Sequence, residues 1–341
     1  MAAVTDALKT VVEGKDLSVS KMQAVMDEIM TGRATDAQIG ALLVALRMKG
    51  ETVDEILGAA RVMREKAQRI SPMLQHADVL VDIVGTGGDQ AETFNVSTTC
   101  AFVVAGAGLK VAKHGNRSVS SRSGSADLLE RLGVRLDVPP NIVERCIEEA
   151  GLGFLFAPAL HPAMKNVIGP RKEMGIRTIF NLLGPLTNPA GAQVELMGIF
   201  DPGLCEKMAQ VLGQLGAKRA WVVHGEGGMD ELSISGPSVV AQWDGQEVKS
   251  FEITPSDFSL DTAPLSSIAG GGPDENAKIT LSILKGDKGP RRDMVLLNSA
   301  AAIFLAGRAG DYKEAKEVAS EAIDSGKAMK VLERLIEMTN R

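Results

Sequence analysis

The stretch Val79–Leu132, VLVDIVGTGGDQAETFNVSTTCAFVVAGAGLKVAKHGNRSVSSRSGSADLLERL, determines the fold class that we expect. It begins with a short apolar run rich in β-branched side chains, which predicts a strand that ends at a glycine-rich turn. A helix is expected over 93–107, a second short strand over 109–112 and another helix over 125–132. Strand, loop and helix repeated in this way predict parallel strands joined by right-handed crossovers. The loops after both strands then leave the carboxyl ends of the sheet, where open α/β sheets bind ligands.

Later segments extend the same pattern. The apolar runs at 194–199 and 220–223, with a helix at 204–215 between them, predict further strands of the sheet. The expected fold is therefore α/β, with a central, mainly parallel sheet in the larger part of the chain.

The residues before Pro72 predict helices only. Apolar side chains, many of them methionine and leucine, recur there at helical spacing, and Thr35 with Gln38 and Thr52 with Glu55 match the capping-box pattern. The apolar stripes have two interpretations, the core of a small helical bundle or a surface for self-association.

These patterns predict two domains. We expect a small helical domain over residues 1–72, joined by helices around 165–190, and a larger α/β domain over residues 73–341. A chain of 341 residues is also longer than a single typical core.

Composition narrows the class of protein. The formal net charge of −6 argues against a general nucleic-acid binder, which would show a basic face. No apolar run approaches the ~20 residues of a membrane span, so no membrane partner is expected. The three cysteines, Cys100, Cys146 and Cys205, form no CxxC pair, which favours reduced thiols and a cytoplasmic location.

A basic, hydroxyl-rich loop stands out in this acidic chain. Between Lys110 and Arg122 there are four cations and no acid, and several serines follow Asn116. Cations, hydroxyls and glycine amides together bind small polyanions. His114 alone is more typical of a structural histidine, but beside Lys113 and Asn116 a substrate contact becomes an equal alternative.

The turn Gly85–Asp89, GTGGD, could be no more than a tight connection between a strand and a helix. It matches neither GxGxxG nor a Walker A pattern, so it does not indicate a dinucleotide or ATP. However, Asn95–Thr98 begins the next helix, where free amides and the helix dipole favour an anion. Two such loops together indicate a substrate with more than one phosphate.

A third group is His224–Glu231, HGEGGMDE, which ends in two adjacent carboxylates. Such a pair is often only a solvated surface. Here the pair follows an apolar strand and a glycine-rich loop, and hard oxygen ligands without a cysteine or histidine cluster suit magnesium.

These motifs resemble the anthranilate phosphoribosyltransferases, and the resemblance runs through nearly the whole chain. It is carried by GTGGD, NVST, KHGNRSVSS, GSADLLE, the long stretch HPAMKNVIGPRKEMGIRTIFNLLGPLTNP (161–189), MDE (229–231) and GGGPDENAKITLSIL (270–284). Single motifs are shared with pyrimidine nucleoside phosphorylases, but the KHGNR and RTIFNLLGPLTNP versions resemble the transferases.

The resemblance implies transfer of the phosphoribosyl group of phosphoribosyl pyrophosphate (PRPP) to the amine of anthranilate, a step of tryptophan biosynthesis. It also implies a pair of Mg²⁺ ions, a homodimer and, as a further partner, a glutaminase subunit of anthranilate synthase. Two alternatives stay open: a nucleoside phosphorylase of the same fold, and a non-catalytic relative that binds nucleic acid through a basic surface.

The resemblance also assigns residues. The catalytic residues would be His114, Asn116 and Arg171, and the magnesium ligands Ser97, Asp230 and Glu231. Anthranilate would contact Gly85, Asn116, His161 and Arg171, where the planar guanidinium of arginine matches a carboxylate. The residues implied for PRPP are Gly85, Gly88, Asp89, Thr93, Asn95, Val96, Ser97, Thr98, Lys113, His114, Gly115, Asn116, Arg117, Ser118, Val119, Ser120, Ser121 and Ser125.

Overall fold

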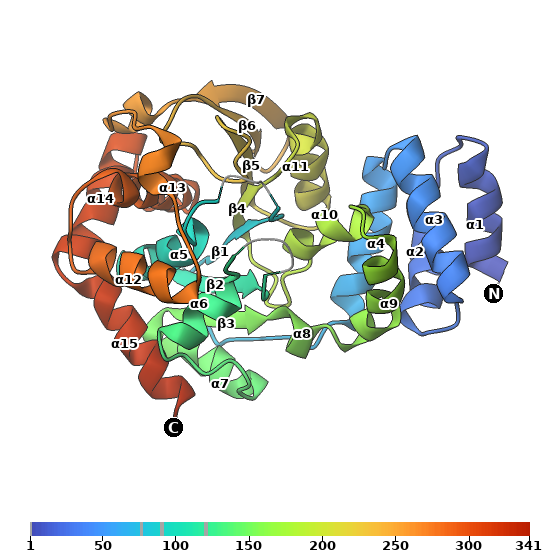
Figure 1. Cartoon of the computed structure of the whole chain (residues 1–341), viewed down its shortest axis with the longest axis horizontal. Helices are drawn as coiled ribbons and strands as arrows, with labels where there is room; N and C mark the ends of the chain where they lie inside the picture. Colours follow the sequence, from blue (N-terminus) through green and yellow to red (C-terminus); the bar gives the residue numbers. More distant parts are fainter. Residues whose placement is uncertain (1, 76–77, 89–91, 119–121) are drawn as a thin grey trace.

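The structure, a computed structural model, describes residues 2–75, 78–88, 92–118 and 122–341. A bundle of helices lies beside a larger α/β part, and the two meet along α4, α10 and α11 (Figure 1). The expected fold class, a helical part with a mainly parallel sheet, is confirmed.

The described residues form one sheet of seven strands in the order β3-β2-β1-β4-β5-β6-β7. The first five strands are parallel, and β6 and β7 are antiparallel. The strands are β1 (Leu80–Gly85), β2 (Lys110–Gly115), β3 (Leu152–Phe156), β4 (Val194–Gly198), β5 (Arg219–Gly225), β6 (Ser238–Trp243) and β7 (Val248–Ile253).

The strand order reverses between β1 and β4. From β1 the chain moves outward to β2 and β3, and then returns to the other side of β1 as β4. The register pairs Asp82 with Glu195 and Gly85 with Gly198, so both strands end at the same level. Loops that leave this edge diverge, and such a switch point is where doubly wound sheets bind ligands.

The amino-terminal helices are α1 (Ala2–Val12), α2 (Val19–Met30), α3 (Asp36–Lys49) and α4 (Val53–Lys66). Both expected capping boxes, at Thr35 and at Thr52, are confirmed. Helices α9 (Lys165–Met174) and α10 (Ile179–Leu186) pack against this bundle. The apolar stripes of α2, α3 and α4 are buried in one core that continues onto one face of the sheet, so the interpretation as core is the one the structure supports.

The other face of the sheet carries the second large core. Val81, Ile83, Val111 and Leu196 point into it, while their neighbours along the strands point away, as the period of a strand requires. The remaining helices are α5 (Val96–Gly106), α6 (Ser125–Arg131), α7 (Pro140–Arg145), α8 (Ala157–Leu160), α11 (Cys205–Gln214), α12 (Pro273–Leu284), α13 (Pro290–Leu305), α14 (Tyr312–Asp324) and α15 (Lys327–Thr339).

Two boundaries differ from the sequence expectation in ways that affect the site. Helix α5 begins at Val96 rather than at 93, because Thr93 pairs as an isolated bridge with Ala269. Strand β2 continues through Lys113 and His114, which we expected in a loop. Both side chains are thereby fixed by the sheet.

Within the described residues, no helix is both long and apolar enough to cross a bilayer.

Candidate active site

The loop after β1, which the structure describes from Gly85 to Gly88, lies at the switch point. The Thr86 amide donates to the Gly198 carbonyl at 3.1 Å, and the Phe200 amide donates to the Thr86 hydroxyl at 3.2 Å, so the end of β4 holds the loop. Gly87 and Gly88 have φ of 72° and 74°, a conformation that side chains other than glycine rarely adopt. Turns of this kind present successive amides to an anion.

Asp230 reaches this loop from the segment after β5. The Gly87 amide donates to Asp230 Oδ2 at 2.7 Å. A Cβ at Gly85 would collide with the Asp230 carboxylate, and one at Gly198 would collide with its backbone. Two glycines, one at the end of each central strand, therefore create the space that Asp230 occupies.

Glu231 occupies the start of α5 in a similar way. The Ser97 amide, in the first turn of that helix, donates to Glu231 Oε1 at 3.1 Å. This brings together two of the residues expected to hold metal, Ser97 and Glu231, at a helix end that attracts negative charge.

Lys113 lies behind both loops. Its buried ammonium donates to the Ile83 carbonyl at 2.7 Å and to Ser97 Oγ at 3.3 Å. Burial lowers the pKa of Lys113, and the nearby negative charges, chiefly that of Asp82 and also those of Glu231 and Asp230, act in the opposite direction. Lys113 thus supplies positive charge from beneath the site.

His114 and His161 form a buried pair. Their Nε2 atoms are 3.2 Å apart, and His114 Nδ1 lies 3.1 Å from the carbonyl oxygen of Gly184 on α10. A carbonyl only accepts, so His114 carries its proton on Nδ1 and accepts at Nε2 from His161. Burial lowers the pKa of His114 to about 3 and that of His161 to about 4. Both rings are therefore neutral at pH 7.

Arg171, on α9, is half-buried, and its guanidinium lies 5.4 Å from the centre of the Phe180 ring on α10. Burial lowers the pKa of Arg171. Phe180 and Gly184 are four residues apart and so share one face of α10. Arg171 and the histidine pair therefore approach the same helix face, although within the described residues no hydrogen bond joins Arg171 to Asn116 or Gly85.

The basic loop begins at Gly115 and Asn116, where β2 ends. Ser125 Oγ donates to the Asn116 carbonyl at 3.1 Å, and the Asn116 side chain is exposed. A Cβ at Gly115 would collide with Ser125 Oγ, so glycine is required for this approach of α6 to β2.

Arg117 does not direct its charge into the site. Its guanidinium bonds both carboxylate oxygens of Glu130, at 2.6 and 2.7 Å, and also Asp127 at 3.1 Å. The amide of Ser118 donates to Asp127 as well. Of the other residues expected at this site, Asp89, Val119, Ser120 and Ser121 lie outside the described residues.

Asn95 connects the start of α5 to two other segments. It exchanges hydrogen bonds with Ser123, at 3.0 and 3.1 Å, and accepts from Asn276 on α12 at 2.9 Å. Val96 and Thr98 are buried behind it. Asn95 thus fixes the helix end relative to the serine-rich segment.

Comparisons with known proteins identify the family of the chain. The chain matches the family models described as glycosyl transferase family, helical bundle domain, over residues 5–67, and glycosyl transferase family, a/b domain, over residues 77–329. It is 56% identical to the anthranilate phosphoribosyltransferase of Symbiobacterium thermophilum over 334 residues, 98% of this chain and 97% of that protein.

The chain belongs to the anthranilate phosphoribosyltransferase family.

Solved structures of this family superpose closely. The enzyme from Thermus thermophilus matches with a TM-score of 0.93 and 45% identity, covering 98% of this chain and 100% of that chain. The Saccharomyces cerevisiae enzyme in complex with PRPP and Mg matches with a TM-score of 0.88 and 30% identity, covering 99% and 98%. The yeast enzyme is also known in complex with 4-fluoroanthranilate.

Two polar residues of this anthranilate phosphoribosyltransferase fold escaped the sequence analysis. Asp82 is fully buried in β1, accepts from the His114 amide at 3.2 Å and from Asn188 Nδ2 at 2.7 Å, and burial raises its pKa to about 6. An acid inside an apolar strand is a usable signal, because a buried carboxyl needs partners. Arg177 donates to the Gly88 carbonyl, and nothing in its local sequence indicates that contact.

The residues expected to hold magnesium fit that ion. Ser97, Asp230 and Glu231 offer only hard oxygen atoms, and the glycines at 85 and 198 leave room for Asp230. In the described part of the chain, no three His, Cys, Asp or Glu residues come together as a metal cage. Magnesium does not need one, since it commonly combines a few protein ligands with water and substrate phosphate.

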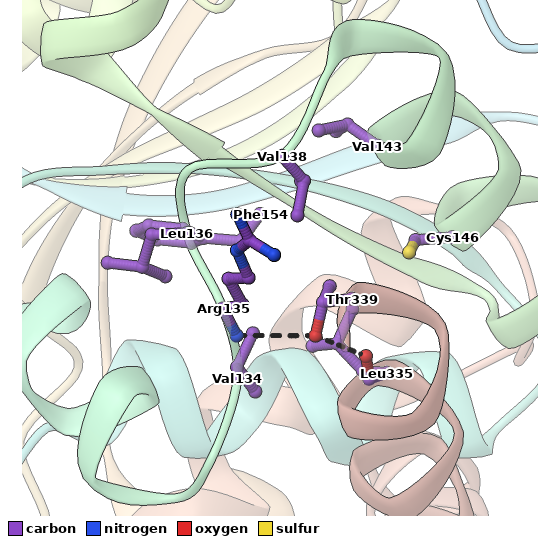
Figure 2. A pocket seen from close by; sticks show the side chains of 9 residues that line it. All are labelled: Val134, Arg135, Leu136, Val138, Val143, Cys146, Phe154, Leu335 and Thr339. Atoms are coloured by element: carbon purple, nitrogen blue, oxygen red, sulfur yellow. Dashed lines mark hydrogen bonds between the residues drawn. The ribbon is translucent and has the colours of Figure 1, made fainter. Parts of the chain in front are cut away.

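A small cavity elsewhere is not a substrate site. It lies between the segment 134–138, the sheet and α15, has a volume of about 10 Å³ and is lined largely by apolar side chains (Figure 2). The Arg135 amide donates to Thr339 Oγ1 at 3.2 Å across one side. Such a volume holds no more than about one water molecule.

Proposed function

We infer that this chain transfers the phosphoribosyl group of PRPP to the amine of anthranilate, giving N-(5-phosphoribosyl)anthranilate and pyrophosphate for tryptophan biosynthesis. One observation supports this above the others. The glycine-rich loop and the start of α5 converge at the switch point, with the Lys113 ammonium 3.3 Å from Ser97 Oγ beneath them. The arrangement suits a ligand that carries several phosphates.

The proposed PRPP contacts are those that the family resemblance implies, and the geometry of the described residues supports part of them. The amides of the glycine-rich loop and of the first turn of α5 would bind phosphate oxygens, and Lys113 would attract them from below. The proposed set is Gly85, Gly88, Asp89, Thr93, Asn95, Val96, Ser97, Thr98, Lys113, His114, Gly115, Asn116, Arg117, Ser118, Val119, Ser120, Ser121 and Ser125. Arg117 would have to leave Glu130 to contribute its charge.

Magnesium is expected at Ser97, Asp230 and Glu231, and we propose a pair of ions per chain. Bound magnesium stabilises the charge that develops on the departing pyrophosphate. The two carboxylates would position the ions: Asp230 lies at the loop after β1, and Glu231 lies at the start of α5.

Anthranilate is proposed to lie against Gly85, Asn116, His161 and Arg171. Arg171 would bind the carboxylate through its planar guanidinium. The neutral histidine pair would line the path for the aromatic ring without adding a competing cation. We assign direct substrate contact, and so a catalytic role, to His114, Asn116 and Arg171.

The reaction needs an electrophilic anomeric carbon, because the amine of anthranilate is a poor nucleophile. The transition state is oxocarbenium-like, and the protein stabilises it by charge at the leaving group and by holding both substrates in line. No strong general base is assigned.

Release of pyrophosphate tests the function directly. With PRPP and magnesium present, release should begin only when anthranilate is added, and phosphate with a pyrimidine nucleoside should give no free base. The reverse pattern would identify a nucleoside phosphorylase instead.

The proposal also covers the domains, the oligomeric state, a partner subunit and the location of the protein. We propose domains over 1–72, with 165–190 added, and 73–341, and a homodimer formed through the helical part. A glutaminase subunit of anthranilate synthase is a further partner to test by co-elution. The three described cysteines are free and buried, which supports a reducing, cytoplasmic setting.

A further inference from the structure

Arg177 links the helical part of the molecule to the glycine-rich loop. It lies between α9, which packs on α2 and α3, and α10, which packs on α3 and α4. Its Nη2 donates to the carbonyl of Gly88, and its Cζ lies 4.2 Å from the centre of the Phe200 ring. Both partners lie in segments that leave the sheet: Gly88 follows β1 and Phe200 follows β4.

The contact holds a part of the loop that would oppose an anion. The amides of a glycine turn attract phosphate, whereas its carbonyl oxygens repel it. The Gly87 amide already points to a carboxylate, that of Asp230, at 2.7 Å. The carbonyl of the following residue, Gly88, accepts from the guanidinium of Arg177.

Phe200 reinforces the same arrangement. The guanidinium of Arg177 lies over the ring of Phe200. The amide of Phe200 donates to the Thr86 hydroxyl, in the glycine-rich loop, at 3.2 Å. A guanidinium over an aromatic face is an attractive pair, and the planar group can stack and donate at once. Phe200 thus contacts both Arg177 and the loop that Arg177 holds.

We propose that Arg177 is a positioning residue for PRPP, which keeps the glycine-rich loop in its anion-binding form by holding the Gly88 carbonyl. The proposal rests on the proposed function. On this proposal the segment between α9 and α10 helps to hold the loop, so the helical part contributes to PRPP binding without touching the phosphates.

The test combines PRPP binding with hydrogen exchange of the loop. Calorimetry with PRPP and magnesium should give a dissociation constant at least about tenfold higher for Arg177→Ala than for the wild type, the usual cost of a lost charged hydrogen bond. In the absence of ligand, the peptide that contains Gly87 should exchange faster in this variant. Arg177→Lys, which keeps a charged donor, should recover most of both effects.

Lys172→Ala is the matched control. Lys172 is an exposed cation on α9, in the same segment, and within the described residues it makes no hydrogen bond to the loop. Its removal should leave PRPP affinity, loop exchange and the melting temperature unchanged. The Michaelis constant for anthranilate should be the same in the Arg177→Ala variant and in the wild type.

Three outcomes would overturn the proposal. Unchanged PRPP affinity in the Arg177→Ala variant would show that Arg177 has no role in PRPP binding. Weaker binding with unchanged exchange of the ligand-free loop would mean that Arg177 touches the phosphates directly. Equal losses for both substrates with a lower melting temperature would indicate a general structural role. A wild-type protein that binds PRPP but transfers nothing would instead contradict the proposed function alone.

Discussion

The amide of Gly87 donates a hydrogen bond to the carboxylate of Asp230 at 2.7 Å, across 143 positions of sequence. Glu231 accepts from the Ser97 amide in the same manner. Two carboxylates therefore lie on amides that an anionic substrate would use. Carboxylates and phosphates at close range repel each other, so binding of a polyphosphate here calls for a cation between them.

The first prediction concerns that cation. The double substitution Asp230→Asn, Glu231→Gln keeps oxygen acceptors for both amides but removes both charges. Turnover at low magnesium should fall by at least about tenfold, because the ions at the leaving group lose the negative charge of two ligands. Titration of magnesium against turnover measures this. An unchanged magnesium optimum with full turnover would show that the two acids are only a solvated surface.

The second prediction concerns the carboxylate of anthranilate. Arg171→Ala should raise the Michaelis constant for anthranilate about tenfold or more, since a charge-assisted hydrogen bond contributes ~1.5–3 kcal/mol. The constant for PRPP should change little. Steady-state kinetics with each substrate varied in turn measures both values, with Lys172→Ala as the control. Equal effects on the two constants would remove Arg171 from the anthranilate site.

The third prediction concerns pH and the histidine pair. Burial lowers the pKa of His114 to about 3 and that of His161 to about 4, whereas an unfolded histidine has a pKa of about 6.5. Between about pH 6.5 and pH 4 the unfolded chain binds more protons. The contribution of the two neutral histidines to stability is therefore complete above pH 6.5. Below pH 6.5, each histidine lowers the free energy of unfolding by about 1.4 kcal/mol for every unit that the pH falls.

His161→Gln should remove one of these two contributions. Urea unfolding of the wild type and of the variant from pH 7 to pH 5 measures the difference in slope, expected to be about 1.4 kcal/mol per pH unit at the lower end. Burial raises the pKa values of Asp82 and Glu195, to about 6 and about 8, which gives a dependence of opposite sign, but both acids are present in both proteins. Parallel curves would show that His161 does not titrate as a buried, neutral group.

The fourth prediction concerns assembly. Most apolar side chains of α2, α3 and α4 are buried within the bundle, but Val12 and Met48 are 66% and 83% exposed. We expect a homodimer whose contact includes these side chains. Light scattering at micromolar concentration should give twice the mass of one chain, and Met48→Lys should lower it. A monomeric wild-type protein would contradict this without affecting the catalytic proposal.

The sequence predicted the elements whose signals are local. The strand at β1, the glycine turn after it and the capping boxes at Thr35 and Thr52 each depend on a few neighbouring residues, and the structure has them. The order of strands and loops also predicted that the loops after β1 and β2 leave the same edge of the sheet, because parallel strands bring their carboxyl ends together.

Contacts between distant segments could not be predicted in this way. Arg117 was expected to face a substrate, but Glu130 on α6 bonds its guanidinium. Lys113 was expected in a loop, but β2 continues through it and turns its ammonium beneath β1. The role of Arg177 depends on Gly88, which is 89 positions away in sequence. Each of these outcomes depends on which chain segments the fold brings together.

Anthranilate fluorescence tests the central claim most directly. In the presence of PRPP and magnesium, the protein should convert anthranilate at a rate proportional to enzyme concentration, seen as a loss of its fluorescence. Omission of PRPP, or chelation of magnesium, should stop the loss. Fluorescence that stays constant with both substrates and magnesium present, in a folded protein, would contradict the assignment of this chain as an anthranilate phosphoribosyltransferase.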